Sequence, residues 1–124
     1  MLFYRCEKCG NFITFLTEKA ATPFCCGEIM VEVVANTVDA AQEKHVPVVE
    51  VKGSEVEVKV GSVAHPMIPE HYIPFVILET SLGCQKRELL PGQEPAAKFA
   101  LAEGEKPLAA YEYCNLHGLW KAVI

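Results

Sequence analysis

The sequence predicts an all-β protein in which a small N-terminal metal-binding domain, residues 1–35, precedes an immunoglobulin-like seven-stranded β-sandwich, residues 36–124. Two observations predict this arrangement. Four of the six cysteines and none of the four histidines lie in the first domain, so the two kinds of metal ligand are segregated along the chain. The remainder breaks into short β-branched runs separated by Gly and Pro, which is the pattern of a sandwich.

The strand pattern is clearest in "HVPVVEVKGSEVEVKVG", where two partly alternating runs flank a turn near residues 52–54. "YIPFVILET" predicts a buried strand, which Pro74 places near a sheet edge or a bend. Four further short strands are expected in "QKRELL", "AKFALA", "LAAYEY" and "LWKAVI". The stretch "PGQEPAAKFALAEGEKP" has some helical propensity, but its prolines and glycines interrupt it.

The N-terminal domain is too small to be stable through apolar burial alone, because units of this size rarely bury enough surface. It therefore needs a crosslink, a metal or a partner subunit. Its cysteines offer the metal. The four phenylalanines offer apolar surface for a second copy; they are Phe3, Phe12, Phe15 and Phe24.

Composition narrows the compartment and the partners. The net charge of −5 argues against nucleic acid and anionic membranes as partners. The first residues lack the pattern of a signal peptide, and the longest apolar stretch, around residues 72–78, is too short to span a bilayer. A soluble cytoplasmic protein is expected. A secreted disulfide scaffold is disfavoured because Cys25 and Cys26 are adjacent.

The first cluster of candidate ligands consists of "CEKCG" and "CCGE", which contribute Cys6, Cys9, Cys25 and Cys26. Four thiolates suit a tetrahedral site for iron or zinc. Gly10 lets the backbone turn so that N–H groups point at sulfur. The spacing alone leaves two readings open, a structural zinc site and a one-iron electron-transfer centre.

The second cluster combines every histidine with one cysteine: His45, His65, His71, Cys114 and His117. Any one histidine would more often be an ordinary hydrogen-bonded side chain, but imidazoles together with a thiolate suit iron or copper. A blue-copper site would leave two histidines unused, and no methionine follows residue 67 to act as its axial ligand. A single iron bound by all five groups keeps one position open for a small oxygen species, with the thiolate opposite donating electron density.

The motifs resemble a known family in the same order along essentially the whole chain. The four cysteines resemble the desulforedoxin module, a mononuclear Fe(Cys)4 domain. "EKHVPV", "GSVAHPM", "EHYI" and "YCNLHGLWKA" resemble segments of desulfoferrodoxin, the two-iron class of superoxide reductase. The resemblance implies two iron ions per chain, one Fe(Cys)4 and one Fe(His)4Cys, and the one-electron reduction of superoxide to hydrogen peroxide. It also implies re-reduction by a rubredoxin-like donor and a homodimer.

The resemblance further implies roles for two residues before the first histidine. Lys44 would attract the anionic substrate and order a proton-donating water, and Glu43 would bind the iron once it is ferric. Backbone N–H groups of the 115–117 turn are expected to bond the Cys114 sulfur. Cys84 matches no ligand motif and is expected to be a free thiol. An electron carrier without substrate and a zinc protein remain as alternative functions.

Overall fold

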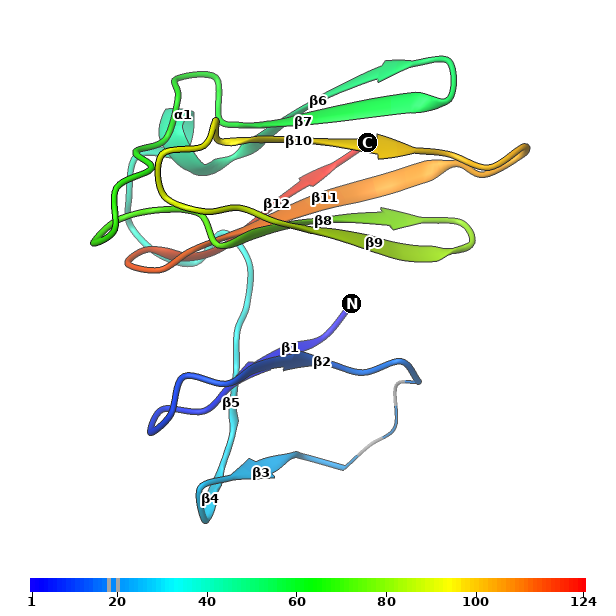
Figure 1. Ribbon diagram of the computed structural model, residues 1–124. Coiled ribbons are helices and arrows are strands. Elements are labelled where there is room, and N and C mark those ends of the chain that lie inside the picture. The colour runs from blue at the N-terminus through cyan, green and yellow to red at the C-terminus, as the bar shows by residue number, and fades with distance from the viewer. Residues whose placement is uncertain (18, 20) are drawn as a thin grey trace. The chain divides into compact units, whose positions relative to one another are not determined.

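The computed structural model describes residues 1–17, 19 and 21–124, and its chain forms two compact units, Met1–Val34 and Ala35–Ile124. Strands dominate both units, and the one helix in the described part of the chain is a single turn (Figure 1). The predicted all-β class is confirmed. No helix among the described residues is long and apolar enough to cross a membrane.

The first unit is built from short antiparallel strands that the sequence did not predict individually. β1 (Phe3–Arg5) lies between β2 (Phe12–Thr14) and β5 (Val31–Glu32), while β3 (Phe24–Cys25) and β4 (Glu28–Ile29) form a separate hairpin. Among its described hydrophobic residues only Phe3, Cys6 and Met30 are buried. So small a core agrees with the expectation that this unit depends on something besides apolar burial.

The second unit is an antiparallel sandwich of seven strands (Figure 1). One sheet has the order β10 (Ala96–Ala100), β7 (Glu55–Val60), β6 (Pro47–Lys52). The other has the order β12 (Gly118–Val123), β11 (Pro107–Cys114), β8 (Phe75–Thr80), β9 (Gly83–Glu88). The seven predicted strands are confirmed.

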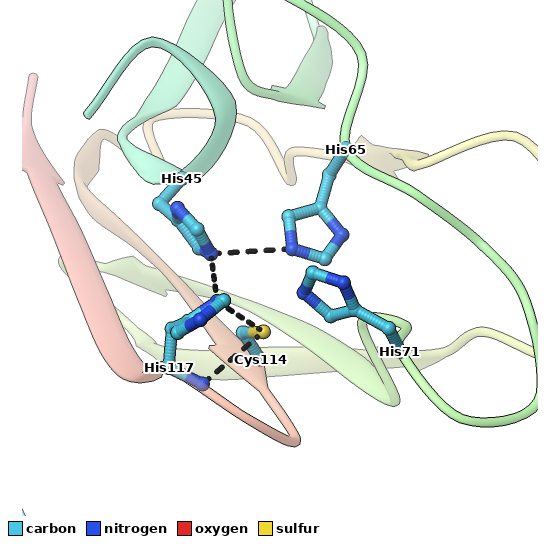
Figure 2. Close-up of side chains that lie close together, drawn as sticks. All are labelled: His45, His65, His71, Cys114 and His117. Atoms are coloured by element: carbon cyan, nitrogen blue, oxygen red, sulfur yellow. Dashed lines mark hydrogen bonds between the residues drawn. The ribbon is translucent and has the colours of Figure 1, made fainter. Parts of the chain in front are cut away.

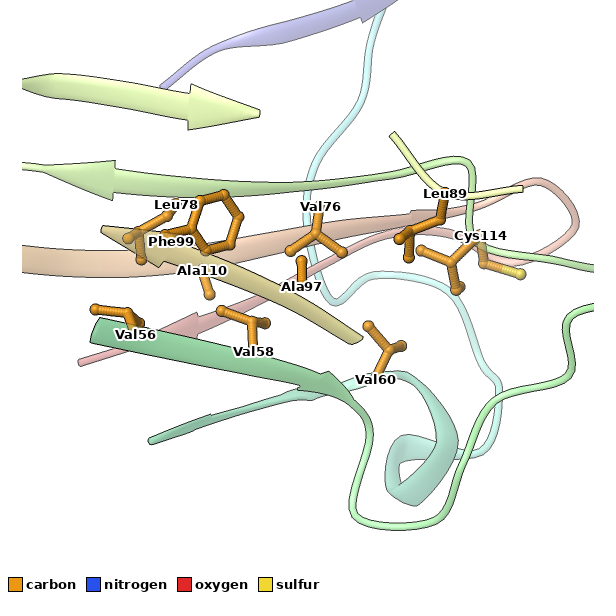
Figure 3. Close-up of a cluster of buried hydrophobic side chains, with 11 residues drawn as sticks. Val56, Val58, Val60, Val76, Leu78, Leu89, Ala97, Phe99, Ala110 and Cys114 are labelled. Atoms are coloured by element: carbon orange, nitrogen blue, oxygen red, sulfur yellow. The ribbon is translucent and has the colours of Figure 1, made fainter. Parts of the chain in front are cut away.

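The core between the two sheets follows from alternation along the strands (Figure 3). Val56, Val58 and Val60 are fully buried on β7, whereas Lys59 of the same strand is exposed. They pack with residues of β10, β8 and β11, and Cys114 belongs to the same cluster. The thiol at the end of β11 is thus held by the core itself.

One of the two alternatives for Pro74 is excluded, and the expected interruption of the helical pattern at residues 91–107 is confirmed. Pro74 immediately precedes β8, so it marks a bend; the alternative of a sheet edge is wrong, because β8 pairs with both β9 and β11. As its prolines and glycines predict, the stretch at residues 91–107 contains no helix. The strand predicted in "AKFALA" is β10, where Phe99 is buried opposite Val56.

The sequence did not predict α1 (Gln42–His45), the single helical turn before β6. Four residues are too few for a periodic signal. The turn nevertheless matters, because it exposes Glu43 and Lys44 to solvent while it buries His45.

Candidate metal centres

Four histidines and one cysteine meet at one end of the sandwich (Figure 2). His45 comes from α1, His65 and His71 from the connection between β7 and β8, Cys114 from the end of β11, and His117 from the turn into β12. One nitrogen or sulfur atom of each lies within 4.8 Å of the corresponding atom of every other. The structure therefore brings together all five residues of the second predicted cluster, from segments up to 72 positions apart.

The four imidazole rings form a closed circle. Neighbouring ring centroids are 4.7 Å apart for His45 and His65, 4.6 Å for His65 and His71, 5.1 Å for His71 and His117, and 5.0 Å for His117 and His45. Each ring is nearly perpendicular to the next, with interplanar angles between 72° and 90°. The nitrogens of several rings can therefore face one central point.

Hydrogen bonds select which nitrogen of two rings faces the centre. Nδ1 of His45 lies 2.7 Å from the carbonyl oxygen of Ala41, and Nδ1 of His65 lies 2.7 Å from that of Pro66. A carbonyl only accepts, so each Nδ1 carries the proton and each Nε2 presents a lone pair. The two Nε2 atoms are 3.2 Å apart. Two such lone pairs facing each other need a cation between them.

His71 and His117 complete the set of nitrogen donors. Nε2 of His71 is buried and has no hydrogen-bond partner. A buried nitrogen without a hydrogen-bond partner is explained if it coordinates a metal ion. His117 presents Nδ1, which lies 3.2 Å from Nε2 of His45 and 3.7 Å from the Cys114 sulfur.

Burial favours the neutral form of His45, His65 and His71. Desolvation lowers the pKa of His65 to about 4, and it is also the largest cause that lowers the pKa of His45 and His71. The neighbouring imidazoles lower all three pKa values further. A metal ligand must be unprotonated, so the site is prepared for a cation at neutral pH.

The Cys114 thiol is fully buried, and this burial is the largest cause that raises its pKa. Backbone N–H groups of Leu116 and His117 act in the opposite direction, and the His117 N–H lies 3.4 Å from the sulfur. The expected N–H contacts from the 115–117 turn are therefore present. A bound metal ion deprotonates a coordinating thiol outright, and these contacts stabilise the resulting thiolate.

Two residues that the sequence analysis missed tie the centre together. Asn115 accepts a hydrogen bond from the Tyr72 N–H (2.9 Å) and donates one to the Glu70 carbonyl (3.0 Å), so it joins the turn after β11 to the segment that contains His71. Trp120 stacks on His45 with ring centroids 4.9 Å apart and donates from Nε1 to the His117 carbonyl at 3.1 Å. Their positions within "CNLHGLW", close to Cys114 and His117, were the only sequence signal for these two roles.

Glu112 is a third buried group that the sequence analysis missed. It lies two residues before Cys114 on β11, and it is fully buried without a hydrogen-bond partner for either carboxyl oxygen. Desolvation raises its pKa to about 9, so it is uncharged at neutral pH. The alternation of β11 places residues 112 and 114 on the same face of the strand, and that pattern could have revealed it.

The four cysteines of the first unit form a second group, with their sulfur atoms within 4.8 Å of one another. Cys6 and Cys9 lie on a knuckle, where the N–H of Cys9 lies 3.4 Å from the Cys6 sulfur and the N–H of Asn11 lies 3.4 Å from the Cys9 sulfur. Gly10 has φ of +78°, as a turn that directs N–H groups at sulfur requires. The N–H groups are the largest cause that lowers the pKa of Cys6, to about 6.

The adjacent pair Cys25 and Cys26 sits on the β3–β4 hairpin. Cys26 and Gly27 form its turn with φ of +52° and +75°, the positive values of a two-residue type I′ turn. Hydrogen bonds to neighbouring thiols raise the pKa of Cys25, and they raise that of Cys26 to about 12. A bound cation would favour the thiolate form of Cys25 and Cys26 over the protonated form.

Both groups fit a transition metal by the chemistry of their donors. Four sulfurs suit a tetrahedral iron or zinc ion, and four imidazoles with a thiolate suit iron or copper. All six cysteines are free, and the exposed Cys84 on β9 lies outside both groups. Glu43 and Lys44 also lie outside the donor group, on the helical turn that carries His45. The fold and the two groups define a class, an all-β protein with two separate mononuclear metal centres.

Comparison with known proteins identifies the family within this class. The family model for desulfoferrodoxin matches residues 37–123. The desulfoferrodoxin of Syntrophotalea carbinolica is 48% identical over 119 residues, which cover 96% of this chain and 93% of the relative. The chain belongs to the desulfoferrodoxin family, and its two donor groups correspond to two iron sites, Fe(Cys)4 and Fe(His)4Cys.

Solved structures agree with this assignment. The chain is similar to the superoxide reductase from Treponema pallidum with a TM-score of 0.82 and 46% identity, covering 97% of this chain and 98% of that one. A one-iron superoxide reductase from Giardia intestinalis matches only 66% of this chain, yet 97% of its own length, with a TM-score of 0.56 and 38% identity. The one-iron relative therefore matches a part of this chain that is about as long as the second unit, Ala35–Ile124.

Proposed function

We propose that this protein is a superoxide reductase, which reduces superoxide by one electron to hydrogen peroxide and is then re-reduced by an external donor. The observation that carries the proposal is the closed circle of four imidazoles beside one buried thiol. Five protein donors would leave one position of a six-coordinate ion open for substrate. The named superoxide reductases among the similar structures support the same reaction.

The residues that would hold the catalytic iron are His45, His65, His71, Cys114 and His117. When bound, this iron supplies the single electron. Burial favours the neutral form of His45, His65 and His71, and backbone N–H groups directed at the Cys114 sulfur would tune the electron donation of the thiolate. Two protons, delivered from solvent, complete the conversion of superoxide to hydrogen peroxide.

Lys44 attracts the substrate in this proposal. The protein has a net charge of −5, so any attraction for an anion must be local. Lys44 is exposed on α1, and its charge is among the causes that lower the pKa of His71, which supports a role for this ammonium beside the circle of imidazoles. The same ammonium can order a water molecule that donates a proton.

Glu43 has the opposite role. It is exposed on the same turn, and its charge is among the causes that raise the pKa of His45. A carboxylate is a hard oxygen ligand that suits ferric iron. We assign to Glu43 the role of binding the oxidised iron and helping to displace the product.

The first centre, with Cys6, Cys9, Cys25 and Cys26 as ligands, has two candidate roles. It relays electrons from a rubredoxin-like donor, or it stabilises the small unit and its contact with a second copy of the chain. Exposed apolar side chains in this unit favour a homodimer: Leu16, Phe24, Ile29, Val31 and Val34. Thiols that must stay reduced to bind metal favour the cytoplasm.

A superoxide pulse tests the proposed function. Iron-loaded, reduced protein is mixed with superoxide while the oxidation of iron and the yield of hydrogen peroxide are followed. One peroxide per iron oxidised at the second centre, without oxygen release, is expected. Slow oxidation with no peroxide would favour an electron carrier, in which cyanide or azide would also leave the spectrum unchanged. A colourless protein would favour zinc, which is spectroscopically silent.

A further inference from the structure

The carbonyl group of Glu43 lacks its partner within α1 for a reason visible in the sequence. In a helix this oxygen would accept a hydrogen bond from the N–H four residues later, and that residue is Pro47, which has no N–H. The turn therefore cannot satisfy this carbonyl by itself. The hydrogen bonds within the turn involve other groups. The Val46 N–H donates to the Gln42 carbonyl (2.9 Å), and the Lys44 N–H donates to the Ala41 carbonyl (3.2 Å).

The loop after β7 supplies the missing donors. The N–H of Val63 donates to the Glu43 carbonyl at 2.8 Å, and the hydroxyl of Ser62 donates to the same oxygen at 3.2 Å. Two donors from consecutive residues thus hold one oxygen of the turn that carries Glu43 and Lys44.

Gly61 allows this close approach. A Cβ atom at this position would lie 2.8 Å from the Glu43 carbonyl oxygen and 2.9 Å from that of Val46, closer than real Cβ contacts. Both are backbone atoms, so neither can rotate away. Only glycine lets the loop pack directly on the helical turn.

The same loop leads directly to the second histidine. The Gly61 N–H donates to the Val63 carbonyl at 3.3 Å, and the His65 N–H donates to the Val60 carbonyl at 2.9 Å. The loop is therefore tied at both ends, to the last residue of β7 and to His65. A displacement of α1 would have to break its contacts with a segment that the sandwich holds.

We propose that Gly61, Ser62 and Val63 form a clamp that positions the helical turn carrying Glu43 and Lys44 relative to the circle of imidazoles. Ser62 and Gly61 are positioning residues, since they act through the turn and not on the substrate. The expected effect of the clamp on superoxide reduction rests on the proposed function. The clamp itself is a set of contacts that can be measured without superoxide.

Ser62→Ala tests the clamp, because it removes one donor without adding bulk. Ser62→Thr keeps the hydroxyl and should rescue, while Ser54→Ala, in the exposed turn between β6 and β7, is the matched control. Hydrogen exchange is measured on the iron-loaded full-length proteins. The amides of residues 44 and 46 should exchange about fivefold faster in Ser62→Ala, since one neutral hydrogen bond is lost.

The second readout is the rate constant for consumption of superoxide and its dependence on ionic strength. A loosened turn holds Lys44 less often in place, so Ser62→Ala should lower the rate constant about twofold or more and flatten its salt dependence. Ser62→Thr and Ser54→Ala should match the wild type. Gly61→Ala, if it folds, should exceed Ser62→Ala in both readouts.

Unchanged exchange in Ser62→Ala would overturn the clamp. Faster exchange with an unchanged rate constant and salt dependence would overturn its positioning role. A wild-type protein that consumes no superoxide would instead refute the proposed function, and the exchange data would still decide whether the clamp exists.

Discussion

The two metal centres of this protein are built in opposite ways. The cysteines of the first lie within 21 positions of each other, on a knuckle and a hairpin whose thiols are partly exposed around a core of few residues. The donors of the second come from four separate segments, and three of the five are buried at the end of a seven-stranded sandwich. The first centre is local in sequence and the second is not.

This difference predicts that metal has a different role in each unit. A small unit whose apolar core is minimal must draw its stability from the metal, so binding and folding are one event. Because Cys114 belongs to the sandwich core, we expect the second unit to keep its fold when metal is removed. The imidazoles, which already face one another, should then accept the ion without a large rearrangement. Variants at each centre test whether metal has these different roles in the two units.

The largest effect is expected for Cys114→Ser, which removes the only sulfur from the second centre. The thiolate-to-iron absorption of the oxidised protein should disappear, and superoxide reduction should be lost with it. Circular dichroism of the sandwich should stay unchanged, because a serine fits the buried position of the thiol. An unchanged absorption band would exclude Cys114 as a ligand.

Cys9→Ser should have a large effect confined to the first unit. Loss of one of four thiolates removes the iron that we expect to stabilise residues 1–34, so their amides should lose protection from exchange while β7 and β8 keep theirs. Single-turnover reduction of superoxide should survive. A protected first unit would contradict the comparison, and lost single turnover would make the relay role obligatory.

The smallest effect is expected for Lys44→Ala, which touches no proposed ligand. The rate constant for superoxide should fall by about tenfold at low ionic strength, because the local positive charge is lost. It should also depend less on salt than in the wild type. Lys52→Ala, an exposed lysine at the end of β6, serves as the control. Parallel salt series for Lys44→Ala and wild type would count against attraction by this residue.

Motifs carried most of what could be predicted about the sites. Both donor groups could be predicted from the cysteine pairs, the histidine segments and "CNLHG". Metal ligands are recognisable by residue type and spacing, whatever the fold. Strand alternation similarly predicted β6 and β7, since a two-residue period reflects a half-buried strand. Alternation could not predict the strands of the first unit, because they are only two or three residues long.

The sequence by itself determined the all-β class, the segregation of the two ligand sets and the absence of an N–H at Pro47 that could donate to the Glu43 carbonyl. Only the tertiary structure decided which nitrogen of each histidine faces inward, that Trp120 stacks on His45, and that Ser62 and Val63 reach the Glu43 carbonyl. These contacts join segments far apart in the chain. Their partners are chosen by packing of the two sheets, which no local pattern of residues encodes.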